Sequence, residues 1–177
     1  AARYKYFGNW GHAQIAGILR RISYLHNNSM DKLYGWGLMA STIINLNTNN
    51  TLYAQFSFGE GIANYCVGFE NRQLDAVYNP NLNDMVLKRI HGGYVNLNHQ
   101  INPKMTLSAT AGVSYLKNYD FEDKSSFWSS KYLALTYFYV PIETISLGLE
   151  VTTGIRINED RQQGNATRIS MVGSFSF

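Results

Sequence analysis

Six ionisable side chains stand inside stretches of this 177-residue sequence in which polar and apolar residues alternate. They are Arg3, Lys5, Arg20, Glu150, Arg156 and Arg168. Guanidinium groups bind carboxylates and phosphates through paired hydrogen bonds, and they keep their charge at any physiological pH. Rings of Arg or Lys are also how aqueous pores favour anions. If these side chains share one face of a sheet, we expect that face to attract small anions.

The sequence offers no pattern for covalent or metal chemistry. Its four histidines are isolated and lack metal-ligand spacing: His12, His26, His91 and His99. No Ser has the context of a nucleophile elbow. The stretch "GEGIAN" has two of the three glycines of a dinucleotide-binding loop, but Asn64 replaces the third. We therefore predict no catalytic residue, no metal site and no cofactor, and the single Cys66 cannot form an intrachain disulfide.

A period of two residues runs through the chain and predicts about nine β-strands. The expected strands cover 2–7, 12–25, 35–46, 51–59, 86–101, 105–117, 128–140, 146–158 and 166–177. Many of them are longer than the about 5–6 residues usual in globular proteins. A tilted strand needs about 9–11 residues to cross a bilayer. These lengths favour an all-β, antiparallel, up-and-down transmembrane β-barrel.

The two faces of each predicted strand differ in polarity. Between 146 and 158 the odd positions are Leu, Leu, Val, Thr, Ile and Ile, and the even ones are Gly, Glu, Thr, Gly, Arg and Asn. A soluble β-sandwich with its apolar face inward would alternate in the same way. The polar face, however, carries Gly, Ser, Thr and Asn rather than the charged coat of a soluble surface. We therefore predict that the apolar face contacts lipid and that the six ionisable side chains line the lumen.

Aromatic residues gather near the predicted strand ends, as expected where lipid meets water. They are Tyr4, Tyr6, Phe7, Trp10, Tyr137, Tyr139, Phe175 and Phe177. Short turns and longer polar loops alternate along the chain, which places the turns at a periplasmic end and the loops at an extracellular end. Phe177 then belongs to the lower aromatic girdle, and a terminal Phe resembles the signal that barrel-assembly machinery reads.

Composition argues against other classes of protein. No stretch approaches the roughly 18–20 consecutive apolar residues of a membrane helix. A net charge of +3 without a run of Lys or Arg gives no indication of nucleic-acid binding. No signal peptide is visible, as expected if it had been removed on export or if the N-terminal part of a longer protein were missing.

One predicted loop, residues 60–85, is long for a connection between strands. Its acids are Glu60, Glu70, Asp75 and Asp84. The loop could fold into the lumen and place these acids opposite the arginines, or it could cover the outer rim. The arginines likewise have two interpretations: they could set the electric field of a pore, or they could pair with wall acids such as Glu150.

Six stretches together resemble the DcaP-type outer-membrane porins. They are "GHAQIAGILRRI" (11–22), "GWGLMAS" (35–41), "LYAQFSFGEGIANY" (52–65), "GGYVNLNHQI" (92–101), "YVPIETISLGLE" (139–150) and "GIRINEDRQQGNATRISMVGSFSF" (154–177). The resemblance implies a homotrimeric diffusion channel of the Gram-negative outer membrane for small anions such as dicarboxylates. Outer-membrane lipid and lipopolysaccharide are then expected partners. By motif match it singles out Arg20, Glu150, Arg156 and Arg168 as lumen residues.

The strand count departs from that family. Such a porin has roughly 16 strands, and bacterial barrels close with even strand numbers, whereas this chain supplies about nine. We therefore expect residues 1–177 to be the C-terminal portion of a single barrel domain. The alternative is a complete eight-stranded barrel in which "ARYKYF" is a tail. A barrel of that size is filled by side chains and has no open pore, so its role would be structural or adhesive.

Overall fold

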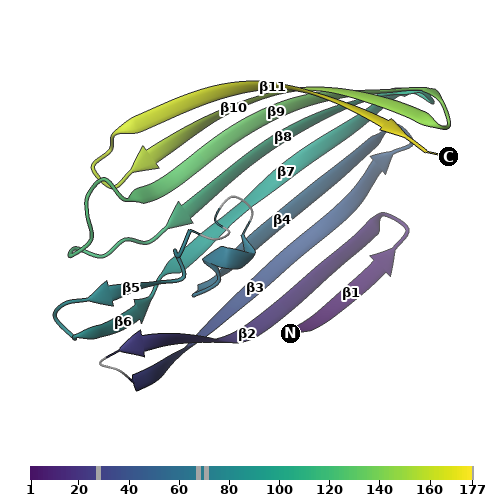
Figure 1. Cartoon of the computed structure of the whole chain (residues 1–177). Helices are drawn as coiled ribbons and strands as arrows, with labels where there is room; N and C mark the ends of the chain where they lie inside the picture. Colours follow the sequence, from purple (N-terminus) through teal and green to yellow (C-terminus); the bar gives the residue numbers. More distant parts are fainter. Residues whose placement is uncertain (27–28, 67–68, 70–71, 177) are drawn as a thin grey trace.

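The computed structural model describes residues 1–26, 29–66, 69 and 72–176. Within them, nine long strands form one antiparallel sheet in which every strand pairs with its neighbours in sequence (Figure 1). They are β1 (Ala2–Gly8), β2 (Gly11–His26), β3 (Ser29–Asn47), β4 (Asn50–Glu60), β7 (Arg89–Asn102), β8 (Met105–Leu116), β9 (Phe127–Ile142), β10 (Ile145–Asn158) and β11 (Gln163–Phe175). The predicted all-β, up-and-down antiparallel architecture is confirmed. Phe177 lies outside the described residues.

Two connections are shorter than the sequence indicates. β3 begins at Ser29 rather than at residue 35, because the register that pairs Arg20 with Gly35 continues without a break through Tyr24 and Asp31. β10 and β11 likewise pair as far as Ile157 and Gln163. The segment expected as a tail in the eight-stranded alternative is instead a strand: β1 pairs along its whole length with β2.

The chain between β4 and β7 forms small elements of its own, here called the inner segment (residues 61–88). The described part contains η1 (Ala63–Tyr65), which lies in front of the sheet in Figure 1, and a hairpin of β5 (Ala76–Asn79) and β6 (Asp84–Leu87), which lies at the lower-left end of the strands. No helix of the described chain is long and apolar enough to span a membrane.

The inner segment packs on the polar face of the sheet. Its Ile62, Ala63 and Phe69 form a buried cluster with Ile90 of β7 and Leu116 of β8. Because Ile90 pairs with Leu116, and register fixes which side chains share a face, this cluster identifies the inner face of the whole sheet. The part of the 60–85 loop that contains Ile62, Ala63 and Phe69 therefore folds over the inner face, as in the first of the two predicted placements. The predicted loop acid Glu70 lies outside the described residues.

Glycine allows this close approach. Gly61, with φ of +67°, turns the chain back over the sheet as β4 ends, in the left-handed region that glycine adopts at no steric cost. A Cβ at Gly37 would lie 2.7 Å from Ile62 Cδ1, so a larger residue in β3 would push the inner segment off the wall.

The opposite, outer face is apolar and bare. Ile15, Leu19 and Met171 are 62%, 83% and 85% exposed, which is the state expected of side chains that contact lipid. Alternation across the register puts the predicted lumen residues on the inner face and these apolar residues on the outer one. Phe7 is an exception to the predicted girdle, because it shares the inner face with Lys5, whose Nζ atom lies 4.7 Å from the centre of the Phe7 ring.

Candidate solute pathway

Arg20 fastens the inner segment to the wall. Its Nη1 atom donates to Asp75 Oδ2 at 2.9 Å and to the Gly61 carbonyl oxygen at 3.1 Å. Its guanidinium carbon lies 5.0 Å from the centre of the Tyr65 ring. Asp75 also accepts a hydrogen bond from the Asn64 backbone N–H at 3.1 Å. The charge of Arg20 is therefore compensated by an acid that the inner segment brings to it.

Glu150 compensates a second arginine. The carboxylate accepts hydrogen bonds from Thr136 at 3.0 Å and Thr152 at 2.9 Å, and Arg168 Nη2 lies 3.3 Å from its Oε1 atom. The sequence left open whether the arginines pair with wall acids, and for Arg168 the structure shows such a pair.

Arg156 and Arg168 do not stand side by side, contrary to the sequence-based interpretation. Arg156 pairs with Gly164, and Arg168 pairs with Thr152. The two arginines are therefore four residues apart along the strands, roughly 14 Å at about 3.4 Å per residue. The cause is the tight β10–β11 connection, which begins pairing three residues earlier than the strand expected at 166.

Arg156 has no acid partner among the described residues. Its Nε atom donates to Asn158 Oδ1 at 2.9 Å, and its guanidinium carbon lies 5.7 Å from the Phe127 ring centre. The side chain lines a cavity of about 720 Å³ between the inner segment and the wall. This cavity is called the segment pocket below.

A second arginine, Arg72, lines the segment pocket from the inner segment itself. No described carboxylate forms an ion pair with it. Polar groups of the wall complete the lining, among them Tyr94, Ser130 and Tyr132. Sequence reasoning missed Arg72, because it lies in an irregular stretch where no periodicity assigns it to a face. Only its position as a cation within an acidic loop distinguishes it.

Arg3 and Lys5 lie on the inner face of β1, at one edge of the sheet, opposite Ala16 and Gln14 of β2. Neither lines the segment pocket. Of the predicted residues, Arg20 pairs with Asp75 of the inner segment, and Arg168 pairs with Glu150. Arg156 lines the pocket without a described acid partner, and the other two cations lie on the edge strand.

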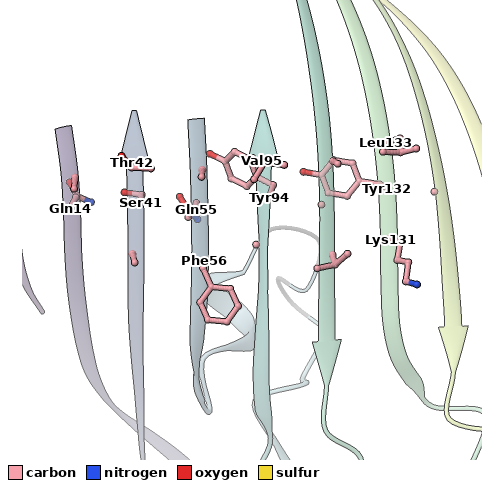
Figure 2. Close-up of a pocket in the computed structure, with 18 of the residues that line it drawn as sticks. Gln14, Ser41, Thr42, Gln55, Phe56, Tyr94, Val95, Lys131, Tyr132 and Leu133 are labelled. Atoms are coloured by element: carbon pink, nitrogen blue, oxygen red, sulfur yellow. The ribbon is translucent and has the colours of Figure 1, made fainter. Parts of the chain in front are cut away.

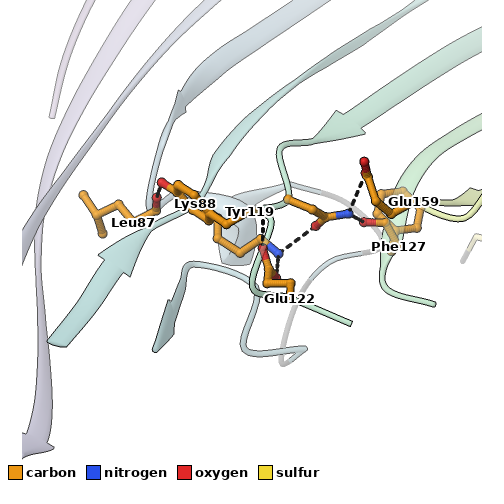
Figure 3. Close-up of polar contacts among 7 residues, drawn as sticks. Leu87, Lys88, Tyr119, Glu122, Phe127 and Glu159 are labelled. Carbon is orange, nitrogen blue, oxygen red and sulfur yellow. Dashed lines mark hydrogen bonds and ion pairs between the residues drawn. The ribbon is translucent and has the colours of Figure 1, made fainter. Parts of the chain in front are cut away.

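The loops at one end of the sheet are tied together by a buried polar network (Figure 3). Lys88, 3% exposed, forms an ion pair with Glu122 and donates to Asn118 Oδ1 at 2.9 Å. Asn118 in turn donates to the Phe127 carbonyl at 3.0 Å and to Glu159 at 3.2 Å. The Tyr119 hydroxyl donates to the Leu87 carbonyl oxygen at 2.8 Å, and burial raises the pKa of Tyr119.

Replacing Lys88 with alanine is expected to loosen this end of the molecule. Glu122 would be left as a buried charge without its partner, a change that costs about 3–5 kcal/mol. Limited proteolysis should then cleave within residues 117–126, and thermal unfolding should begin at a lower temperature. Lys124→Ala, which removes an exposed lysine of the same loop, is the matched control. Equal behaviour of the two variants would contradict a role for the network.

Among the described residues, no group of His, Cys, Asp and Glu could hold a metal ion. The described inner face presents fixed charges and hydroxyl groups.

Comparison with solved structures gives two matches. The crystal structure of the outer membrane channel DcaP of Acinetobacter baumannii has a TM-score of 0.84 and 18% sequence identity, over 99% of this chain and 50% of that chain. The chain therefore has the fold of the matched half of that channel. The NanC porin structure has a TM-score of 0.52 and 9% identity, over 99% of this chain and 97% of that chain. No protein-family model and no curated protein matches the chain.

The predicted resemblance to the DcaP-type porins is confirmed at the level of the fold. The chain spans half the length of the DcaP channel that it matches. Both similar structures are porins or outer-membrane channels, in agreement with the predicted location in the bacterial outer membrane.

Proposed function

We propose that this chain forms part of the wall of an outer-membrane porin, a passive diffusion channel that favours small anionic solutes such as dicarboxylates. The observation that carries the proposal is the segment pocket, a cavity of about 720 Å³ on the inner face of a DcaP-like sheet that Arg156 and Arg72 line. The described acid in its lining, Glu122, is already paired with Lys88, so no described acid compensates the two arginines. Guanidinium groups bind carboxylates bidentately, and free cations along a pore lower the barrier to anions. The protein acts as a channel rather than an enzyme.

The remaining features of the proposal concern the whole protein. Residues 1–177 are the C-terminal portion of a single barrel of roughly 16 strands, an even number as in other bacterial barrels. The barrels assemble as a homotrimer in the Gram-negative outer membrane, in contact with lipid and lipopolysaccharide. Phe177 is the residue that barrel-assembly machinery reads. The intact mass of the native protein tests the first statement, since a barrel of this size requires a chain near twice 20.1 kDa.

The experiment that tests the channel is ion selectivity in a planar bilayer. The purified native protein is reconstituted across a gradient of dilute KCl, where lumen charges are screened over about 30 Å rather than about 10 Å. We expect open channels in groups of three, with a reversal potential of anionic sign and measurable current when a dicarboxylate replaces chloride. A correctly folded protein that never conducts would overturn the proposal and favour the structural or adhesive alternative.

A further inference from the structure

The outer face of the sheet has an apolar hollow of about 1050 Å³, here called the outer hollow (Figure 2). Small outward residues pair with large ones across the strands: Phe56 lies opposite Gly93, and Val95 lies opposite Ala54 and Ala111. Because each large side chain stands beside a residue with little or no side chain, the surface is indented. An indentation of this kind fits a flexible hydrocarbon chain.

Lys131 lines the outer hollow and is exposed. Its cross-strand neighbours on the outer face are Val113 and Ile155, both apolar. No described carboxylate forms an ion pair with it. A cation on a lipid-facing surface is costly unless it reaches the interface or meets an anion, so a negatively charged group from outside the described chain would stabilise this lysine.

An aromatic and cationic cluster, here called the outer shelf, lies one outward row beyond Lys131. His91 stacks on Tyr115 at 5.1 Å, Tyr115 meets the Trp128 ring edge-to-face at 5.7 Å, and the Arg161 guanidinium lies 4.0 Å over Trp128. Tyr115 pairs with Ser129, two residues from Lys131 along β9. A register irregularity between β9 and β10, after Ile157, allows Trp128 to join this face.

Arg161 also forms no ion pair with a described carboxylate. The outer shelf lies at the end of the sheet where the two long connections emerge, which in an outer-membrane barrel is the extracellular end. The patch thus combines two uncompensated cations, a platform of aromatic rings, and an apolar hollow beginning at one of the cations. From the membrane surface inward, the patch therefore presents cations, aromatic rings and then apolar side chains. A lipid with an anionic head group that contains a ring, followed by acyl chains, has matching groups in the same order.

We propose that the outer shelf and outer hollow bind one phosphorylated glycolipid of the outer leaflet, a molecule of the lipid A type. A phosphate lies between Arg161 and Lys131, a sugar ring rests on the aromatic shelf, and an acyl chain occupies the hollow. A second copy of the chain fits less well, because Glu60, the outward acid of the described sheet, already pairs with Arg89 at 2.7 Å. The proposal rests on the outer-membrane location stated above, not on conduction.

The test is binding of diphosphorylated lipid A to the purified native protein in mild detergent, followed by native mass spectrometry. We expect one retained lipid per subunit. Lys131→Gln and Arg161→Gln should each weaken binding about tenfold, as expected for loss of a charge-assisted contact, and Ala111→Leu should weaken it by filling the hollow. Arg21→Gln, which removes a cation of β2 that does not line the hollow, should leave binding unchanged.

Several outcomes would overturn the proposal. If the dephosphorylated lipid bound equally well, the phosphate contact would not contribute to binding. If phosphatidylglycerol bound equally well, the sugar contact would not contribute. Full competition by inorganic phosphate would reduce the site to a free-anion site. Cross-links between Lys131 residues of two subunits would assign the surface to a subunit contact. Heat-modified mobility on gels verifies that each variant is folded, and channel conductance, measured separately, should be unaffected by Lys131→Gln.

Discussion

Replacing Arg156 with alanine is expected to remove much of the anion preference of the channel. Among the described residues, this arginine contacts Asn158 and the Phe127 ring at the segment pocket and has no acid partner, so its charge is available to solutes. A unit charge about 4 Å from an ion in water contributes about 1 kcal/mol, and the anion-to-cation permeability ratio should fall about fivefold. Reversal potentials in dilute KCl measure this ratio. Arg72→Ala should act in the same direction, and the double variant should lose more than either.

Two controls separate a local field from total charge. Arg21→Ala removes the same charge from the outer face of β2 and should change the ratio little. The double variant Arg168→Gln, Glu150→Gln removes a compensated pair, held at 3.3 Å, and should also change it little. If Arg21→Ala and Arg156→Ala had equal effects, the selectivity would come from overall charge rather than from the segment pocket.

The sequence was sufficient to place side chains on faces, because alternation in a strand has a fixed period of two. That period assigned Arg20, Arg156 and Arg168 to the inner face before any pairing was known. The period could not show which of these arginines form ion pairs with acids. Arg20 meets Asp75 across 55 positions of sequence, and that contact depends on how the inner segment folds back at Gly61.

Register limited the prediction in a similar way. The relative positions of Arg156 and Arg168 depend on how many residues the β10–β11 connection leaves unpaired, and polar residues alone do not determine that number. Arg72 lies outside any periodic stretch, so no face could be assigned to it. Composition and periodicity therefore specify the wall, whereas the free charges at the pocket follow from tertiary contacts of an irregular segment.

Replacing Asp75 with asparagine is expected to release the inner segment from the wall. The Arg20–Asp75 contact is largely shielded from solvent, with 20% and 16% of the two side chains exposed, and a charged hydrogen bond of this kind contributes about 1.5–3 kcal/mol. Its loss should raise the population of the detached segment about tenfold or more. Cys66 reports on this directly, because it is the single cysteine and packs against the buried cluster of the segment. Its rate of labelling by a maleimide should rise by a similar factor.

Conductance supplies a second readout of the same event. If the inner segment narrows the pathway, channels of the Asp75→Asn variant should be larger and should fluctuate between levels. Asp120→Asn, which removes an exposed acid from another loop at the same end, should change neither labelling nor current fluctuations. An increase in conductance with unchanged Cys66 labelling would show that Asp75 acts through its charge alone. Increased labelling with unchanged conductance would show that the segment moves but leaves the width of the pathway unaltered, so that the limiting constriction lies elsewhere along the wall.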